Sequence, residues 1–198
     1  VADFNLKSRE GALIANNLLL VVATAIVLLG TFYPLGLEMI TGARITVGPP
    51  YFDATFNPVM GILVVIMVIG PVMAWRRGAT PRAKTTLLAA SVSAIIAGVI
   101  GVAMVQDIAV GAICAVMLIA WLAMGIATDI WTQLKPLQRA GFASRWHRLP
   151  TEVLGMWIAH FGIVVFLLGA TGDGLFRSEQ VVRAKPGEVV TIAGRDVT

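Results

Sequence analysis

The chain has 198 residues, of which 58% are hydrophobic and 13% are charged, and its net charge is +4. Soluble domains carry about twice that charged fraction, so the composition excludes an ordinary soluble domain and indicates an integral membrane protein. The basic residues lie between apolar runs rather than in a stripe interleaved with aromatic residues, which argues against nucleic acid as a partner.

The apolar runs predict an all-α polytopic membrane protein with about five transmembrane helices, because about 20 apolar residues span a hydrocarbon core. In chain order the predicted spans are about 11–33, 58–75, 85–105, 108–127 and 151–171. Pro34 and Gly36 interrupt the first run. The short turn at Gln106 and Asp107 makes the third and fourth helices antiparallel neighbours. Residues 1–171 are therefore predicted to form a transmembrane bundle portion.

The composition changes after the fifth span, where short β-branched runs flank Pro186 and Gly187. This pair is a type II turn signal, so residues 172–198 predict the start of a small extracytoplasmic β-rich domain. An isolated hairpin is only marginally stable in water, and we expect further sequence beyond Thr198 to complete the domain.

Basic residues predict the orientation, because they collect on the cytoplasmic side of bacterial membranes. They lie in three segments that alternate with the predicted spans: Lys7 and Arg9; Arg76, Arg77, Arg82 and Lys84; Lys135, Arg139, Arg145 and Arg148. We therefore expect these three segments to be cytoplasmic and the carboxyl end of the chain to lie outside.

Two features are compatible with either packing or binding. The neighbouring Asn16 and Asn17 in the first span can join helices by hydrogen bonds or can bind a ligand. The segment "VGPPYFDATFNP", residues 47–58, predicts a stiff outer loop, because Pro49 and Pro50 fix their φ angles. Such a loop caps a bundle or presents Tyr51 and Phe52 to a ligand.

His160 is the sharpest candidate for a functional residue, because ionisable residues inside membrane spans are rare and costly. At 3.6 residues per turn it shares a helix face with Val153, Met156, Trp157, Ile163, Val164 and Leu167. This apolar, aromatic-edged slot suits a flat hydrophobic cofactor, and neutral imidazole is a common axial ligand of haem iron. The alternatives are a hydrogen bond to a carbonyl or hydroxyl of a neighbouring helix, and a proton relay.

Four stretches together resemble the later half of the CcmF family, the membrane haem lyases of bacterial cytochrome c maturation. In chain order they are "SREGALIANNLLL", "LLGTFYPL", "ITVGPPYFDATFNPVM" and "RLPTEVLGMWIAHFGIVVFLLGATG". The resemblance covers most of the chain and includes both the loop and the helix that carries His160.

The resemblance implies an enzyme of the bacterial cytoplasmic (inner) membrane that joins haem to the Cys-x-x-Cys-His motif of apocytochrome c. It implies CcmE as the chaperone that delivers the substrate haem, and CcmH and CcmI as the proteins that deliver and reduce apocytochrome c. It also implies a structural b-type haem in the membrane with His160 as one axial ligand, and Met156, Trp157 and Val164 are the expected pocket residues. No catalytic residue is predicted in this chain.

The chain departs from the family pattern in lacking the tryptophan-rich outer segment, the two outer histidines and the second membrane histidine. We therefore expect it to be a piece of a longer protein or one part of a split protein. The rival interpretations are a transporter or channel subunit that uses His160 as a proton relay, and a structural assembly subunit.

Overall fold

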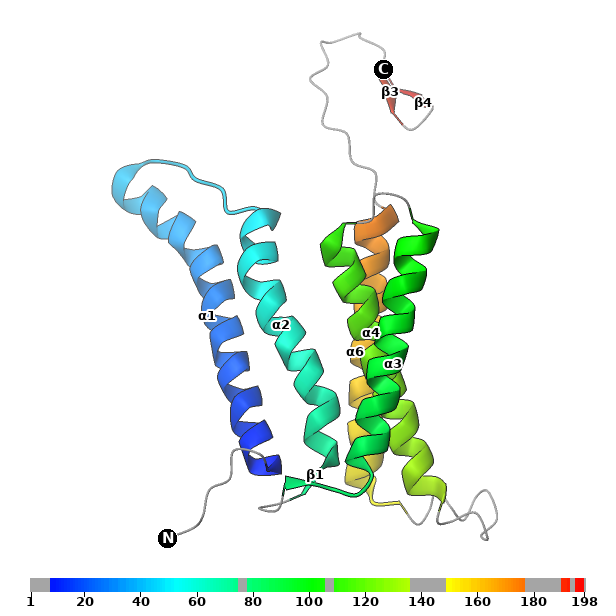
Figure 1. The fold of residues 1–198 in the computed structure, drawn as a ribbon. Coiled ribbons are helices and arrows are strands. Elements are labelled where there is room, and N and C mark those ends of the chain that lie inside the picture. Colours follow the sequence, from blue (N-terminus) through cyan, green and yellow to red (C-terminus); the bar gives the residue numbers. More distant parts are fainter. Residues whose placement is uncertain are drawn as a thin grey trace, which may run out of the picture.

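A computed structural model describes residues 8–74, 78–105, 109–135, 149–176, 190–192 and 195–197. Five helices in this part of the chain are long and apolar enough to cross a membrane, which confirms the predicted all-α membrane architecture. They are α1 (Arg9–Thr41), α2 (Pro49–Val72), α3 (Ala83–Met104), α4 (Val110–Leu134) and α6 (Thr151–Phe176) (Figure 1).

The strands are short and form two antiparallel pairs. β1 (Met73–Ala74) pairs with β2 (Gly78–Ala79) in the connection between α2 and α3. β3 (Val190–Ile192) pairs with β4 (Arg195–Val197), with Val190 opposite Val197. The predicted turn at Pro186 and Gly187 lies outside the described residues.

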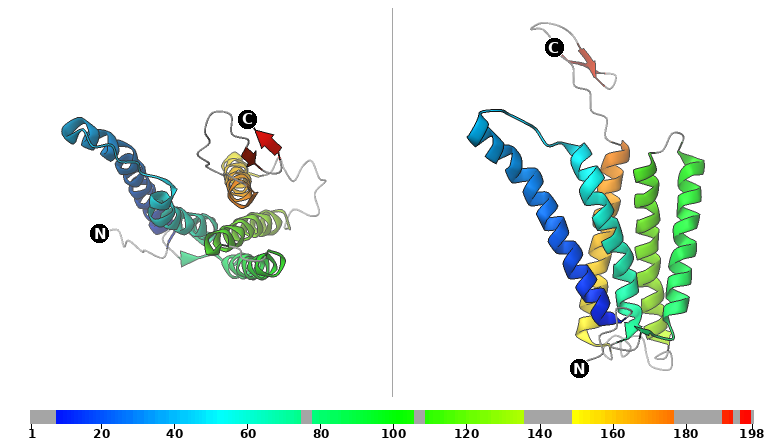
Figure 2. Two further views of the ribbon diagram at one scale, coloured as in Figure 1. Left: turned by 90° about the horizontal axis from the view of Figure 1, so that it is seen from above. Right: turned by 60° about the vertical axis from the view of Figure 1, so that its left-hand side comes forward.

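Helix α4 is the centre of the bundle and packs against α3, α2 and α6 (Figure 2). Helix α1 packs chiefly along α2 at the edge of the assembly. The hydrophobic core is built from the four other helices, and its buried members are Val64, Val68, Ala90, Ile119, Leu122, Ile126, Trp157 and Val164. Within this core, helix α6 packs chiefly against α4.

Helices α3 and α4 form the predicted antiparallel hairpin (Figure 1). Gly98 allows their close approach, because a Cβ atom there would lie 3.0 Å from the side chain of Met117. The Ser93 hydroxyl lies 3.2 Å from the Ala120 carbonyl oxygen of α4 and can donate a hydrogen bond to it. Small residues and a hydroxyl are the groups that membrane helices use at close contacts.

Helix α1 continues through Pro34, where the sequence predicted an interruption, and ends at Thr41. A proline removes one backbone hydrogen bond, but a helix in lipid keeps its remaining bonds because no water competes for them. The helix ends where Gly42 adopts a φ of 69° and donates its N–H to the Glu38 carbonyl over 2.9 Å. This left-handed conformation suits glycine and closes the helix.

The predicted stiff loop at residues 47–58 is wrong beyond Gly48, because α2 begins at Pro49. Proline fits the first helical positions, since its φ angle is already helical and its missing N–H would have no partner there. The Tyr51 hydroxyl donates to the Ile26 carbonyl of α1 over 3.1 Å. The Tyr51 and Phe52 rings pack over Gly30, so the aromatic pair joins two helices.

The described elements that flank the three predicted basic segments lie at one end of the bundle. The start of α1, the β1–β2 pair, the end of α4 and the start of α6 lie together at that end (Figure 1). This arrangement satisfies the requirement that the three basic segments share one side of the membrane.

We expect single cysteines at the two ends of the bundle to react from opposite sides of the membrane. In a background with Cys114→Ala, Lys135→Cys should be labelled by an impermeant thiol reagent only from the cytoplasm, and Ala43→Cys only from outside. Both native side chains are exposed, so reagent access does not depend on unfolding. Labelling of both cysteines from the same side would contradict the orientation.

Candidate functional site

His160 lies near the middle of α6 and is half-buried. Its Nδ1 atom is 2.8 Å from the carbonyl oxygen of Met156, one turn earlier on the same helix. A carbonyl oxygen only accepts hydrogen bonds, so Nδ1 carries the proton and Nε2 keeps its lone pair. This bond fixes the ring and leaves Nε2 as the atom able to bind a metal.

The structure does not show the predicted alternative of a hydrogen bond between His160 and a neighbouring helix. Within the described residues, the ring bonds only to its own helix, through the Met156 carbonyl. Among the described residues, His160 therefore does not join helices by a hydrogen bond, and its Nε2 atom has no partner there.

His160 borders a groove between α1, α2 and α6 with a volume of about 390 Å³. Most of the lining is apolar, and the other polar side chains are Arg9 and Asn16 of α1. Asn16 donates from Nδ2 to the Asn17 side chain over 3.4 Å, so the asparagine pair bonds internally. The fold thus brings Asn16, which the sequence left open between packing and binding, into the same groove as His160.

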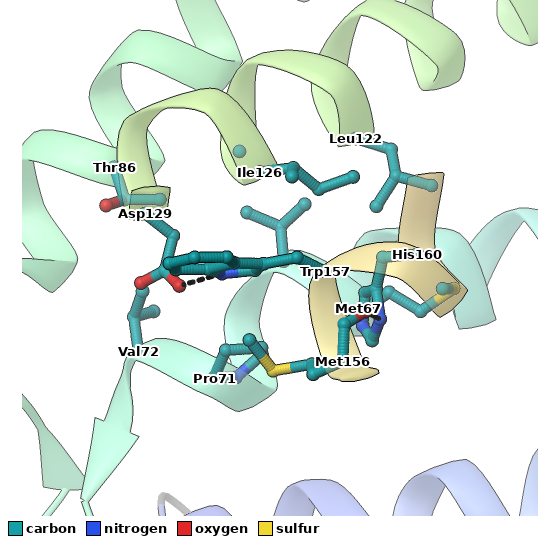
Figure 3. Close-up of a pocket in the computed structure, with 12 residues that line it drawn as sticks. Met67, Pro71, Val72, Thr86, Leu122, Ile126, Asp129, Met156, Trp157 and His160 are labelled. Carbon is teal, nitrogen blue, oxygen red and sulfur yellow. Dashed lines mark hydrogen bonds between the residues drawn. The ribbon is translucent and has the colours of Figure 1, made fainter. Parts of the chain in front are cut away.

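A second cavity, of about 20 Å³, lies on the other side of His160, where α2, α4 and α6 meet. Figure 3 shows His160 beside Met67, while Trp157 points toward Asp129 of α4. This cavity is large enough for about one water molecule. His160 therefore lies between a wide groove and a narrow internal cavity.

The three predicted pocket residues occupy different places. Met156 lines both the groove and the small cavity together with His160. Trp157 is 5% exposed and lines only the small cavity. Val164 is buried in the hydrophobic core and lines neither of these two spaces.

A buried polar cluster around Asp129 was missed by the sequence reasoning. One oxygen of Asp129, Oδ2, accepts a hydrogen bond from Trp157 Nε1 over 2.8 Å (Figure 3) and a second from Gln133 Nε2 over 2.7 Å. The other oxygen lies 3.6 Å from Arg82 Nε, within the range of an ion pair. The fourth span was predicted to end near residue 127, but α4 continues to Leu134 and includes this carboxylate. An acidic residue inside "GIATDIWTQL" was the signal that could have found it.

The chain resembles several cytochrome c-type biogenesis proteins over nearly its whole length. It is 37% identical over 196 residues to "Cytochrome c-type biogenesis protein CcmF" of Pseudomonas fluorescens, a match covering 96% of this chain. It is 39% identical over 188 residues to "Cytochrome c-type biogenesis protein CycK" of Rhizobium meliloti, covering 93% of this chain. The chain is a homologue of part of the CcmF and CycK proteins.

The CcmF and CycK relatives are much longer than this chain, which spans 28% of the length of each of these two. CcmF of Escherichia coli matches at 28% identity over 93% of this chain. Because nearly the whole chain is matched, the helix that carries His160 lies within the segment shared with CcmF. No family model and no solved structure matches the chain.

The donor set around His160 suits haem better than a bare metal ion. Among the described residues there is no group of three or more His, Cys, Asp or Glu side chains able to hold a metal. A bare transition metal needs several such ligands, whereas haem iron already has four porphyrin nitrogens and takes one axial imidazole from a helix. A CcmF-like segment with one membrane histidine beside an apolar groove fits this requirement.

Proposed function

We propose that the chain is part of a membrane haem lyase that attaches haem to the Cys-x-x-Cys-His motif of apocytochrome c. The proposal is supported by the names of the CcmF and CycK relatives, which describe cytochrome c-type biogenesis. The lyase takes its substrate haem from the chaperone CcmE, and CcmH and CcmI deliver and reduce apocytochrome c. The protein lies in the bacterial inner membrane, with the carboxyl end of this chain in the periplasm.

In this proposal the segment holds a structural b-type haem through His160. The observation that carries the assignment is the hydrogen bond from His160 Nδ1 to the Met156 carbonyl, which leaves Nε2 available beside the groove. The groove lining is mainly apolar, as a porphyrin ring requires, and Arg9 adds a positive charge at its edge.

When bound, a b-type haem would supply one-electron transfer to the iron of the substrate haem. The contribution of this chain is to bind and orient. The Met156 carbonyl fixes the imidazole tautomer, His160 Nε2 would hold the iron, and the apolar walls from α2 and α6 would exclude water. Covalent attachment itself would take place outside the membrane.

Covalent attachment of haem to an apocytochrome tests the proposed function directly. The full-length protein and its partners are co-expressed with an apocytochrome in a strain that lacks its own maturation system, and the denatured product is stained for haem. We expect a haem-stained cytochrome band whenever the full-length protein is present. A matched apocytochrome with both motif cysteines changed to serine should give no band. An unstained wild-type cytochrome would reject the lyase assignment.

A further inference from the structure

Asp129 is a carboxylate that the fold buries between helices, with 4% of its surface exposed. It lies on α4 and receives hydrogen bonds from Trp157 of α6 and from Gln133 of its own helix. Arg82 approaches its other oxygen, and the Arg82 Nη2 atom lies 3.4 Å from the Pro71 carbonyl of α2. The carboxylate thus connects α2, α4 and α6 at one point.

The bond between Asp129 and Trp157 is the only side-chain hydrogen bond that joins α6 to another helix within the described residues. The buried residues of α6 are only Trp157 and Val164, and most of its other side chains are exposed. Lipid tails are as apolar as these side chains, so apolar contact alone does little to select one rotation of α6. A hydrogen bond to a buried carboxylate does select one, because breaking it leaves the Trp157 N–H without its acceptor and the carboxylate with one donor fewer.

Trp157 and His160 are three residues apart on the same helix. At 3.6 residues per turn their side chains point about 60° apart and are separated by about 4.5 Å along the axis. Holding the Trp157 ring against α4 therefore sets the direction in which His160 leaves the helix. In the structure that direction leads to the groove between α1 and α2.

We propose that Asp129 is a positioning residue, which fixes the rotation of α6 through Trp157 and so places His160 at the groove. This inference rests on the proposed function only in what it says about haem. The positioning of His160 is a property of the fold and can be measured without haem.

Three variants of the full-length protein separate positioning from general stability. Asp129→Leu removes the acceptor of the Trp157 hydrogen bond, whereas Asp129→Asn keeps an oxygen that can accept it. Ile119→Ala is the matched control, because Ile119 is a buried core residue of α4 that lines neither cavity at His160. We expect all three to lower the thermal midpoint in detergent.

The haem spectrum should distinguish the variants. We expect Asp129→Leu to weaken haem retention about tenfold, the lower end of the range for losing an outer partner of a metal ligand, because Asp129 acts on His160 only through Trp157, and part of the iron should become high-spin. Asp129→Asn and Ile119→Ala should keep the low-spin spectrum. Trp157→Phe should reproduce the Asp129→Leu effect, and the double variant should be no worse than either single one, since both remove the same bond. Additive losses, or an unaltered spectrum in Asp129→Leu, would overturn the proposal.

Cysteine alkylation tests the same proposal without haem. In a Cys114→Ala background, His160→Cys reports the groove side of α6, and Ile158→Cys, at a position 73% exposed, reports the outer side. We expect Ile158→Cys to react faster with a lipid-soluble maleimide, and we expect Asp129→Leu, but not Ile119→Ala, to remove that difference. If the wild-type protein carries no haem, the proposed function fails while this comparison still decides the role of Asp129. If Asp129→Leu left the difference in alkylation rate between Ile158→Cys and His160→Cys unchanged, the positioning role of Asp129 would be rejected.

Discussion

His160→Ala is expected to remove the b-type haem from the full-length protein while leaving its insertion in the membrane intact. Alanine is a good helix former and fits the groove side of α6, so the fold keeps its shape. The iron loses an axial nitrogen, and haem retention should fall by more than about tenfold, the smallest loss typical of even an outer partner of a ligand. The measurement is the reduced-minus-oxidised spectrum of the purified protein, together with the yield of mature cytochrome c.

His147→Ala is the matched control, because His147 is the other histidine of the chain and lies in the basic segment between α4 and α6. The haem spectrum of the His147→Ala protein should equal that of the unmodified protein. Added imidazole should restore the spectrum of His160→Ala, since the space left by the ring accepts the free base. A full-length His160→Ala protein with normal haem content and normal cytochrome yield would show that His160 is not the ligand.

Gly125→Val is expected to separate α2 from α4 and destabilise the bundle. A Cβ atom at Gly125 would lie 2.6 Å from both γ carbons of Val68, a branched side chain that cannot swing away. Overpacking of this kind costs about 1–3 kcal/mol, and we expect a lower thermal midpoint in detergent. The haem pocket should loosen as well, because Gly125 and Val68 both line the cavity beside His160.

Gly155→Ala is the control for Gly125→Val, because it changes another glycine of the same bundle. A Cβ atom at Gly155 meets nothing within 4 Å, so alanine should leave the midpoint unchanged or raise it slightly through its better helix propensity. A Gly125→Val protein as stable as the unmodified one would show that α2 and α4 are not in close contact at this position.

The helix boundaries show where predictions made from local sequence alone were wrong. The apolar run predicted that the first helix stops before Pro34, yet α1 continues to Thr41 because a proline inside lipid has no competing water to open the turn. Pro49 and Pro50 predicted a loop, yet they start α2. Proline is compatible both with an extended loop and with the first turn of a helix. The contact of Tyr51 with α1 forms when Pro49 and Pro50 start a helix.

The sequence by itself determined the class of protein, the five membrane helices and the antiparallel neighbours α3 and α4, because run length and turn length are local properties of the chain. It also pointed to His160, since an imidazole among apolar residues needs a partner. Only the tertiary structure brought Asp129 to Trp157, 28 residues later in the chain, and placed Asn16 and His160 on one groove. Helical periodicity shows which residues share a face, but in a bilayer the lipid-facing and helix-facing sides are equally apolar. Hydrophobicity therefore cannot tell which neighbour each face meets, and that choice is made by close packing and a few buried hydrogen bonds.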